Sequence, residues 1–211
     1  MTLPVAPEPR QSYHHGNLRQ ALIAAALALL EEGGVEALSV RSAAQRAGVS
    51  PGAPFRHFAS RTALLTALAE EATSQLRQRV EAAVQDAAHA APLARFTSLG
   101  QAYLGWACEH PAQFRVVSDR RLIDFDGSER LQADNEAIRQ LMGRLLTDGV
   151  APGIDVRLAQ LTARALAYGL ARMACDGHLD EWTASGPGGG EAMSAALSFF
   201  VQLLEGGPSA G

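Results

Sequence analysis

The sequence predicts an all-α protein with about nine helices. Along most of the 211 residues, apolar side chains recur at the i, i+3, i+4 and i+7 spacing of a helix face. Caps, glycines and prolines interrupt this pattern at intervals of ordinary helix length, and no segment alternates in the way that a half-buried strand does. We therefore expect helices joined by short loops and no sheet.

The first predicted helix begins at Asn17, a suitable N-cap, and ends at Gly33 and Gly34. Its apolar stripe consists of Leu18, Leu22, Ala25, Leu29 and Leu30. The preceding residues 1–13 are rich in proline, and we expect them to form a disordered arm.

Residues 39–58, SVRSAAQRAGVSPGAPFRHF, have the pattern of a helix-turn-helix. Ser39 is a good N-cap, and Gly48 stands where a left-handed residue would end the helix. The apolar face between them consists of Val40, Ala43, Ala44 and Ala47. Ser50 and Pro51 suit the start of a second helix of two turns, which could enter a major groove of DNA. A helix pair inside an ordinary all-α core would give the same signals.

Pro54 disturbs this second helix. If Ser50 is the N-cap, Pro54 stands at N4, where it lacks the amide for the first intrahelical hydrogen bond. It also disfavours helical torsion angles at Ala53. We expect a recognition helix that is distorted or that starts late.

A long amphipathic helix follows the N-cap Ser60, and the whole arrangement resembles the tetracycline-repressor (TetR) family of bacterial transcription regulators. The resemblance covers about the first third of the chain and rests on four motifs. In chain order these are EEGGVEALSV, AAQRAGVS, FRHF and SRTALLTAL. The resemblance implies a helix-turn-helix DNA-binding domain over residues 14–60. It also implies an α-helical ligand-binding and dimerisation domain over residues 61–211.

The YHHG element at residues 13–16 also resembles the start of one TetR subgroup, which is named for a Trp-His-Gly signature in its C-terminal domain. Tyr168 and Gly169 stand where His-Gly would be, without a tryptophan beside them. Nothing about a ligand is inferred from this subgroup.

The distribution of charge favours DNA binding by the N-terminal part. The chain has a net charge of -4, yet residues 1–62 hold six arginines against four acidic residues. The remainder holds 12 arginines against 18 acidic residues, so the excess of positive charge is confined to the helix-turn-helix part.

Charge and position select the candidate phosphate contacts, which are Arg41, Ser50, Arg56, His57 and Arg61. For each arginine the alternative is a solvated surface residue, and Arg46 fits that alternative better. The resemblance implies that the position of Arg61 usually carries a lysine that meets a phosphate, and arginine keeps that charge.

Base contacts are expected from the start of the recognition helix, at Ser50, Gly52 and Ala53, whose side chains have little polar reach. Sequence discrimination would then depend on thymine methyl groups, Arg56 and DNA shape. Phe55, a further candidate DNA contact, stands where the resemblance implies a tyrosine that binds phosphate; without that hydroxyl group, packing alone is the alternative role.

Beyond residue 80 the sequence predicts five or six further helices. The breaks between them are expected at 91–92, 110–111, 126–127, 151–153 and 185–190. Helices at about 155–176 and 190–205 lack a broad polar face, so each would be buried on two sides. Their apolar or small residues are Leu158, Leu161, Ala165, Leu166, Tyr168, Gly169, Leu170, Met173, Met193, Ala196, Leu197, Phe200, Val201 and Leu204. We expect these two helices to meet their symmetry mates in a homodimer, as the resemblance implies, with recognition helices about 34 to 36 Å apart.

Large apolar residues are available to line a cavity for a small-molecule inducer. The candidates are Phe96, Tyr103, Trp106, Phe114, Met142, Tyr168, Met173 and Trp182. For each of them, plain core packing is the alternative. In a TetR-like regulator, such a ligand would shift the DNA-binding heads through the helix that starts at Ser60.

Metal, cofactor and membrane signals are weak. Cys108 with His110, and Cys175 with His178, give only two donors each, so we expect no metal and no cofactor. The motifs of hydrolases, zinc proteases and nucleotide-binding enzymes are missing, and no apolar run approaches the ~20 residues of a membrane span. We expect a cytoplasmic repressor. The alternatives are a regulator on the same scaffold with weak or no specific DNA binding, and an all-α enzyme.

Overall fold

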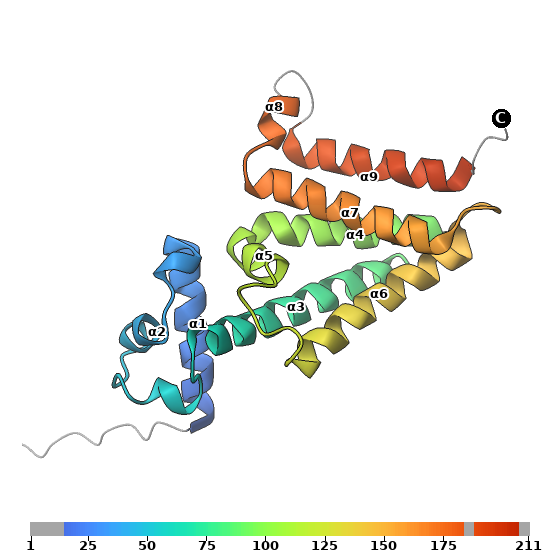
Figure 1. The fold of residues 1–211 in the computed structure, drawn as a ribbon. Coiled ribbons are helices and arrows are strands. Elements are labelled where there is room, and N and C mark those ends of the chain that lie inside the picture. Colours follow the sequence, from blue (N-terminus) through green and yellow to red (C-terminus); the bar gives the residue numbers. More distant parts are fainter. Residues whose placement is uncertain (1–14, 184–187, 207–211) are drawn as a thin grey trace, which may run out of the picture. The chain divides into compact units, whose positions relative to one another are not determined.

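The computed structural model describes residues 15–183 and 188–206, which form nine α helices and two 3₁₀ helices (Figure 1). No strand occurs within these ranges, and the all-α prediction is confirmed. None of the helices in the described part is long and apolar enough to cross a membrane. The chain divides into two compact units between Leu64 and Leu65. The predicted arm over residues 1–13 lies outside the described residues.

The first unit contains α1 (His15–Gly33), η1 (Val35–Ala37), α2 (Val40–Arg46) and η2 (Pro54–Arg56). Helix α1 starts before Asn17, so the expectation that Asn17 is its N-cap is wrong, whereas its end at Gly33 is as predicted. α1 packs against α2 and both 3₁₀ helices. The largest buried side chains of this small core are Leu22, Leu30, Leu38, Phe58 and Leu64.

Helix α3 (Arg61–Asp86) begins in the first unit and continues into the second. Ser60 is its N-cap, because the Ser60 Oγ accepts a hydrogen bond of 3.0 Å from the amide of Ala63. The chain therefore enters the second unit as a continuous helix of 26 residues.

Six helices follow in the second unit, which is the upper limit of the five or six that the sequence predicted. They are α4 (Pro92–Glu109), α5 (Pro111–Ser118), α6 (Glu129–Gly149), α7 (Val156–Cys175), α8 (Leu179–Thr183) and α9 (Gly189–Gly206). Pro92 and Pro111 each open a helix, where a missing amide costs nothing. Asp155 caps α7 by accepting from the amides of Arg157 and Leu158.

Helix α4 lies at the centre of the second unit and packs against α6, α7 and α9 (Figure 1). Its inward face carries Trp106, which is 1 % exposed, and Tyr103 at 6 %. Gly100 allows α9 to come close, since a Cβ at this position would lie only 2.6 Å from Cδ2 of Leu197. Leu197 is itself 2 % exposed and has little room to move.

We expect Gly100→Ala to lower the free energy of unfolding by about 1–3 kcal/mol, because the added methyl group overpacks the contact between α4 and α9. Urea denaturation at a fixed protein concentration measures this. Gly143→Ala in α6 is the matched control. Its Cβ would meet Gln160 at an ordinary 3.6 Å, so the better helix propensity should stabilise the protein by up to about 1 kcal/mol. Equal stability of the two variants would contradict the close approach of α4 and α9 at Gly100.

Candidate functional site

Helix α2 begins with a reciprocal pair of serines. The Oγ of Ser39 accepts a hydrogen bond of 2.9 Å from the amide of Ser42, and the Oγ of Ser42 accepts one of 2.8 Å from the amide of Ser39. This capping box satisfies two amides that have no partner within the helix. The predicted N-cap is confirmed, and Ser42 is a partner that sequence reasoning missed.

The turn after α2 has the geometry that the sequence predicted. Gly48 has a φ of 67° in the left-handed region, which glycine adopts without a Cβ clash. Its amide donates to the carbonyl of Gln45 at 3.2 Å, and the amide of Val49 donates to the carbonyl of Ala44 at 3.1 Å. These two hydrogen bonds form a Schellman motif, which fixes the direction in which the chain leaves α2.

The second helix of the helix-turn-helix is short and starts late. After a turn in which the Ala53 amide donates to the Ser50 carbonyl at 3.1 Å, only the 3₁₀ helix Pro54–Arg56 follows. The predicted late start is confirmed, but the expectation of a helix of two turns is wrong. Ala53 keeps helical torsion angles (φ -63°, ψ -41°), so the expected distortion there is wrong as well. Pro54 instead opens the 3₁₀ helix, because its fixed φ suits the first position.

Most of the side chains predicted to contact DNA lie on the surface of the first unit. Arg41, Ser50, Gly52 and Arg56 are exposed, and Ala53 and His57 are half-buried. The ring of Phe55 is 46 % exposed, so packing alone does not account for it.

Arg61 also holds the first unit together. Its Nε donates a hydrogen bond of 2.8 Å to the carbonyl of Leu38, and its Nη2 donates one of 2.6 Å to the carbonyl of Val35. The start of α3 is thereby tied to the segment that precedes α2. Two of the five guanidinium N–H groups are used in this way, and the others can still reach a phosphate.

Arg46 is engaged elsewhere. Its two terminal nitrogens donate to the two carboxylate oxygens of Glu32, both at 2.6 Å, and these hydrogen bonds lower the pKa of Glu32. This pairing across α1 and α2 agrees with the low rank of Arg46 among the candidate phosphate contacts.

The second unit contains a cavity of about 1040 Å³. Helices α3 to α7 and the segment between α5 and α6 contribute to its wall. The apolar part of the wall includes Leu76, Tyr103, Phe114, Val117, Ile138 and Met142. This volume suits a small-molecule ligand.

Only some of the predicted ligand contacts line this cavity. Tyr103, Phe114 and Met142 do. The others lie outside its wall. Phe96 and Trp106 are in the core, and Met173 packs against it. Tyr168 is 37 % exposed, with its ring 6.0 Å from that of Phe114, and Trp182 is 79 % exposed.

Sequence reasoning missed the polar part of the wall. Most of it is formed by two stripes with helical spacing, Gln132, Asn135, Glu136 and Arg139 on α6 and Arg157, Gln160 and Arg164 on α7. The i, i+3, i+4, i+7 spacing was visible in the sequence, but polar residues on a helix usually face solvent. Burial raises the pKa of Tyr103, so its phenol enters the cavity as a neutral hydroxyl group.

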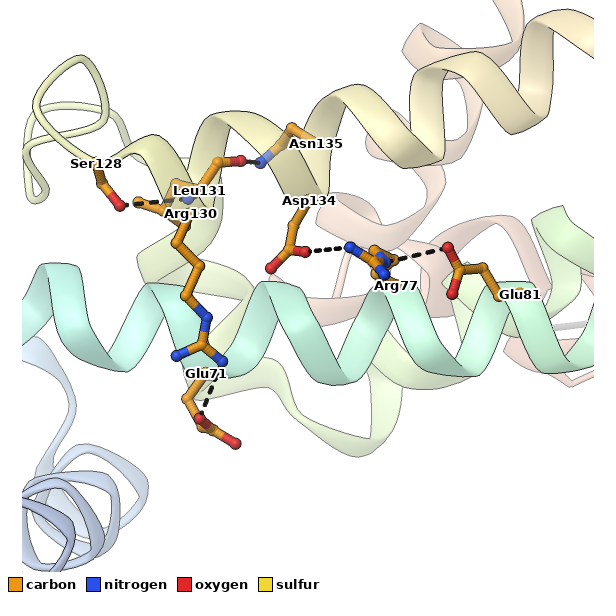
Figure 2. A network of polar contacts seen from close by, with 8 residues as sticks. All are labelled: Glu71, Arg77, Glu81, Ser128, Arg130, Leu131, Asp134 and Asn135. Carbon is orange, nitrogen blue, oxygen red and sulfur yellow. Dashed lines mark hydrogen bonds and ion pairs between the residues drawn. The ribbon is translucent and has the colours of Figure 1, made fainter. Parts of the chain in front are cut away.

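Polar contacts fasten α6 to α3, the helix that begins at Arg61 (Figure 2). Nη1 of Arg77 on α3 lies 2.8 Å from Oδ1 of Asp134 on α6, and Asp134 is only 5 % exposed. Arg130 lies 3.4 Å from Glu71, and the Ser128 hydroxyl donates to Glu70 at 2.8 Å. Side-chain contacts therefore bridge α6, which contributes to the cavity wall, and α3.

Helices α7 and α9 pack against each other, and each carries large exposed apolar side chains, which we call together the exposed apolar surface of α7 and α9. It consists of Leu158 (62 % exposed), Leu161 (65 %), Phe199 (64 %) and Leu203 (56 %). Of the apolar residues of α9 that were named from the sequence, Met193, Leu197, Val201 and Leu204 face the protein's own core. The exposed Phe199 and Leu203 were not among the residues named from the sequence.

No three histidine, cysteine or acidic side chains within the described ranges lie close enough together to hold a metal ion.

Comparisons with known proteins match both units. Residues 22–68 match a model described as bacterial regulatory proteins of the tetR family, and residues 96–197 match a tetracycline repressor-like C-terminal domain. The HTH-type transcriptional regulator BetI of Cronobacter sakazakii is 28 % identical over 155 residues, which are 74 % of either chain. The subgroup resemblance stays a prediction, because neither description names that subgroup.

Solved structures share the fold over nearly the full length. A protein of unknown function from Rhodococcus sp. RHA1 is 34 % identical, with a TM-score of 0.77, covering 92 % of this chain and 99 % of its own. A bacterial regulatory protein of the tetR family from Rhodococcus RHA1 is 19 % identical, with a TM-score of 0.69, covering 89 % and 96 % respectively.

We expect Arg61→Ala to lower the free energy of unfolding by about 1–3 kcal/mol, because it removes two charge-assisted hydrogen bonds to the main chain. Arg41→Ala is the matched control, since its exposed side chain should contribute less than about 0.5 kcal/mol. Urea denaturation followed by circular dichroism measures both variants. A loss of equal size in the two would show that Arg61 does not stabilise the first unit.

Proposed function

Because the chain belongs to the TetR family of bacterial transcriptional regulators, we propose that it is a homodimeric repressor released from operator DNA by a small molecule. One observation carries this proposal. Helix α3 begins at Arg61, which is bonded to the helix-turn-helix unit, and contributes Thr73 and Leu76 to the cavity wall. A ligand that prefers one position of α3 would shift the equilibrium between states that bind DNA well and poorly.

The DNA contacts follow from exposure and charge. Arg41 at the start of α2 and Arg56 in η2 bind phosphates, with Ser50 and His57 beside them. Arg61 adds positive charge at the start of α3. Gly52 and Ala53 offer no polar group for base readout, whereas the exposed ring of Phe55 can contact thymine methyl groups. Recognition then depends mainly on apolar contacts and DNA shape.

The homodimer forms through the exposed apolar surface of α7 and α9. Four large apolar side chains lie more than half exposed there, and two copies of this surface would form a four-helix interface. A soluble monomer seldom presents so many large apolar groups on two adjacent helices.

A regulator with weak or no specific DNA binding is the second candidate. The reduction of the recognition helix to the 3₁₀ turn Pro54–Arg56 favours it, because fewer side chains can enter a groove. Comparison of binding to the DNA upstream of the protein's own gene with binding to a scrambled duplex distinguishes the two. Equal affinity for both duplexes would favour this second candidate.

We expect Arg41→Ala to weaken binding to all duplexes and to flatten its salt dependence. Each phosphate contact contributes about 0.9 to the slope of log K against log salt, so a dimer that loses two contacts should lose about 2. Fluorescence anisotropy at several salt concentrations measures the slope. Arg46→Ala is the control on the same helix, because Arg46 is already paired with Glu32. An unchanged slope in Arg41→Ala would remove this residue from the interface.

We expect Leu158→Asp and Phe199→Asp to weaken dimerisation by at least about tenfold, because each would bury an unpaired carboxylate. Sedimentation velocity over a concentration series measures the dissociation constant. Phe55→Asp places the same charge on an exposed apolar residue of the first unit and should leave the dimer intact. A monomeric wild-type protein at about 10 μM would contradict the proposed dimer, whose expected affinity is typical of stable homodimers.

A further inference from the structure

The cavity wall is rich in arginine. Four of the 12 arginines in residues 63–211 line it. Of the 18 acidic residues in the same part of the chain, only Glu136 is among the lining residues. That part of the chain is acidic as a whole, so the composition of the wall is opposite to that of its surroundings.

Only one of these arginines is neutralised by a carboxylate. Arg139 donates to both oxygens of Glu136, at 2.7 and 2.5 Å. Within the described ranges, Arg120, Arg157 and Arg164 form no ion pair with a carboxylate. All three are exposed to solvent, so an anion that enters the cavity can reach them.

Aromatic rings hold two of the three in place. The guanidinium carbon of Arg120 lies 3.0 Å from the centre of the Phe125 ring, and that of Arg164 lies 5.4 Å from the centre of the Tyr103 ring. A guanidinium group held over a ring face keeps N–H groups at its edge for an acceptor, and Arg164 has more than one such group beyond its hydrogen bond with Tyr103.

Arg120 and Arg164 are near enough to affect each other. Burial lowers the pKa of Arg120, and the positive charge of Arg164 lowers it further, while Asp126 has the opposite effect. An anion bound between the two guanidinium groups would relieve this repulsion and would form charge-assisted hydrogen bonds with both.

The same cavity offers an apolar region for the rest of the ligand. Phe114, Ile138 and Met142 line it, and the volume of about 1040 Å³ exceeds the needs of an inorganic ion. A small anion without an apolar part would leave this surface in contact with water.

We propose that the cavity binds an amphipathic organic anion, whose carboxylate or phosphate head lies between Arg120 and Arg164 and whose apolar body packs against Phe114, Ile138 and Met142. This inference rests on the proposed function, because it names the chemical class of the small molecule that releases the repressor.

Displacement of a neutral fluorescent reporter, N-phenyl-1-naphthylamine, by four compounds with the same decyl chain tests the inference. They are decanoate, decyl phosphate, decanol and decyltrimethylammonium. We expect the two anions to displace the reporter at concentrations at least about tenfold lower than the alcohol, and the cation to be the weakest. The ratio between decanoate and decyl phosphate identifies the preferred head group.

Arg120→Gln and Arg164→Gln remove one charge each and should weaken the anions by about tenfold, while the reporter and decanol bind as before. Arg172→Gln is the matched control on α7, because Arg172 is paired with Asp176 and does not line the cavity. Loss of reporter binding in the cavity variants would mean that the arginines only shape the cavity, which would overturn the inference.

The remaining outcomes separate the two proposals. If the alcohol or the cation displaces the reporter as well as the anions do, the cavity is a ligand site but the inference about charge is wrong. If the wild-type protein binds neither the reporter nor any decyl compound, the proposed ligand-controlled function fails together with the inference.

Discussion

The ion pair between Arg77 and Asp134 joins the two helices on which both functional parts of the molecule depend. Helix α6 supplies a large part of the cavity wall, and α3 continues from the cavity to the first unit. A carboxylate that is 5 % exposed is costly without a partner, so Asp134 constrains α6 to stay beside Arg77. Moving α6 away from Arg77 would leave this buried charge without its ion-pair partner, and the cost of doing so opposes such a movement.

Arg61 performs the corresponding role at the start of α3. Its hydrogen bonds to the carbonyls of Val35 and Leu38 connect the first turn of the helix to the segment that positions α2. The residue that we propose as a phosphate contact thus also fixes the helix that carries it. Helix α3 thus carries polar attachments at its first residue, in the first unit, and along its middle, in the second unit.

The sequence predicted features that depend on neighbouring residues more accurately than features that depend on packing. Ser39, Gly48 and Ser60 act locally through caps and a left-handed turn, and all three were assigned correctly. The length of the recognition helix was overestimated, because serine and proline signals mark a start but carry no information about how far a helix continues. The polar wall of the cavity was missed because the search favoured large apolar residues, and whether Arg164 faces a cavity or open solvent depends on helices distant in the chain. The direction of the apolar face of α9 was likewise decided by packing, since apolar residues occur nearly all round that helix.

Leu161 lies at two places of functional interest. It lines the cavity, and it also belongs to the exposed apolar surface of α7. In the proposed dimer, a molecule inside the cavity would touch the same side chain that meets the second subunit. Occupancy of the cavity and association of the subunits would then be thermodynamically linked, and each would change the other by the same factor. The apparent affinity for the ligand would consequently vary with the concentration of the protein itself, so the amount of regulator in the cell would help to set the ligand level at which it responds.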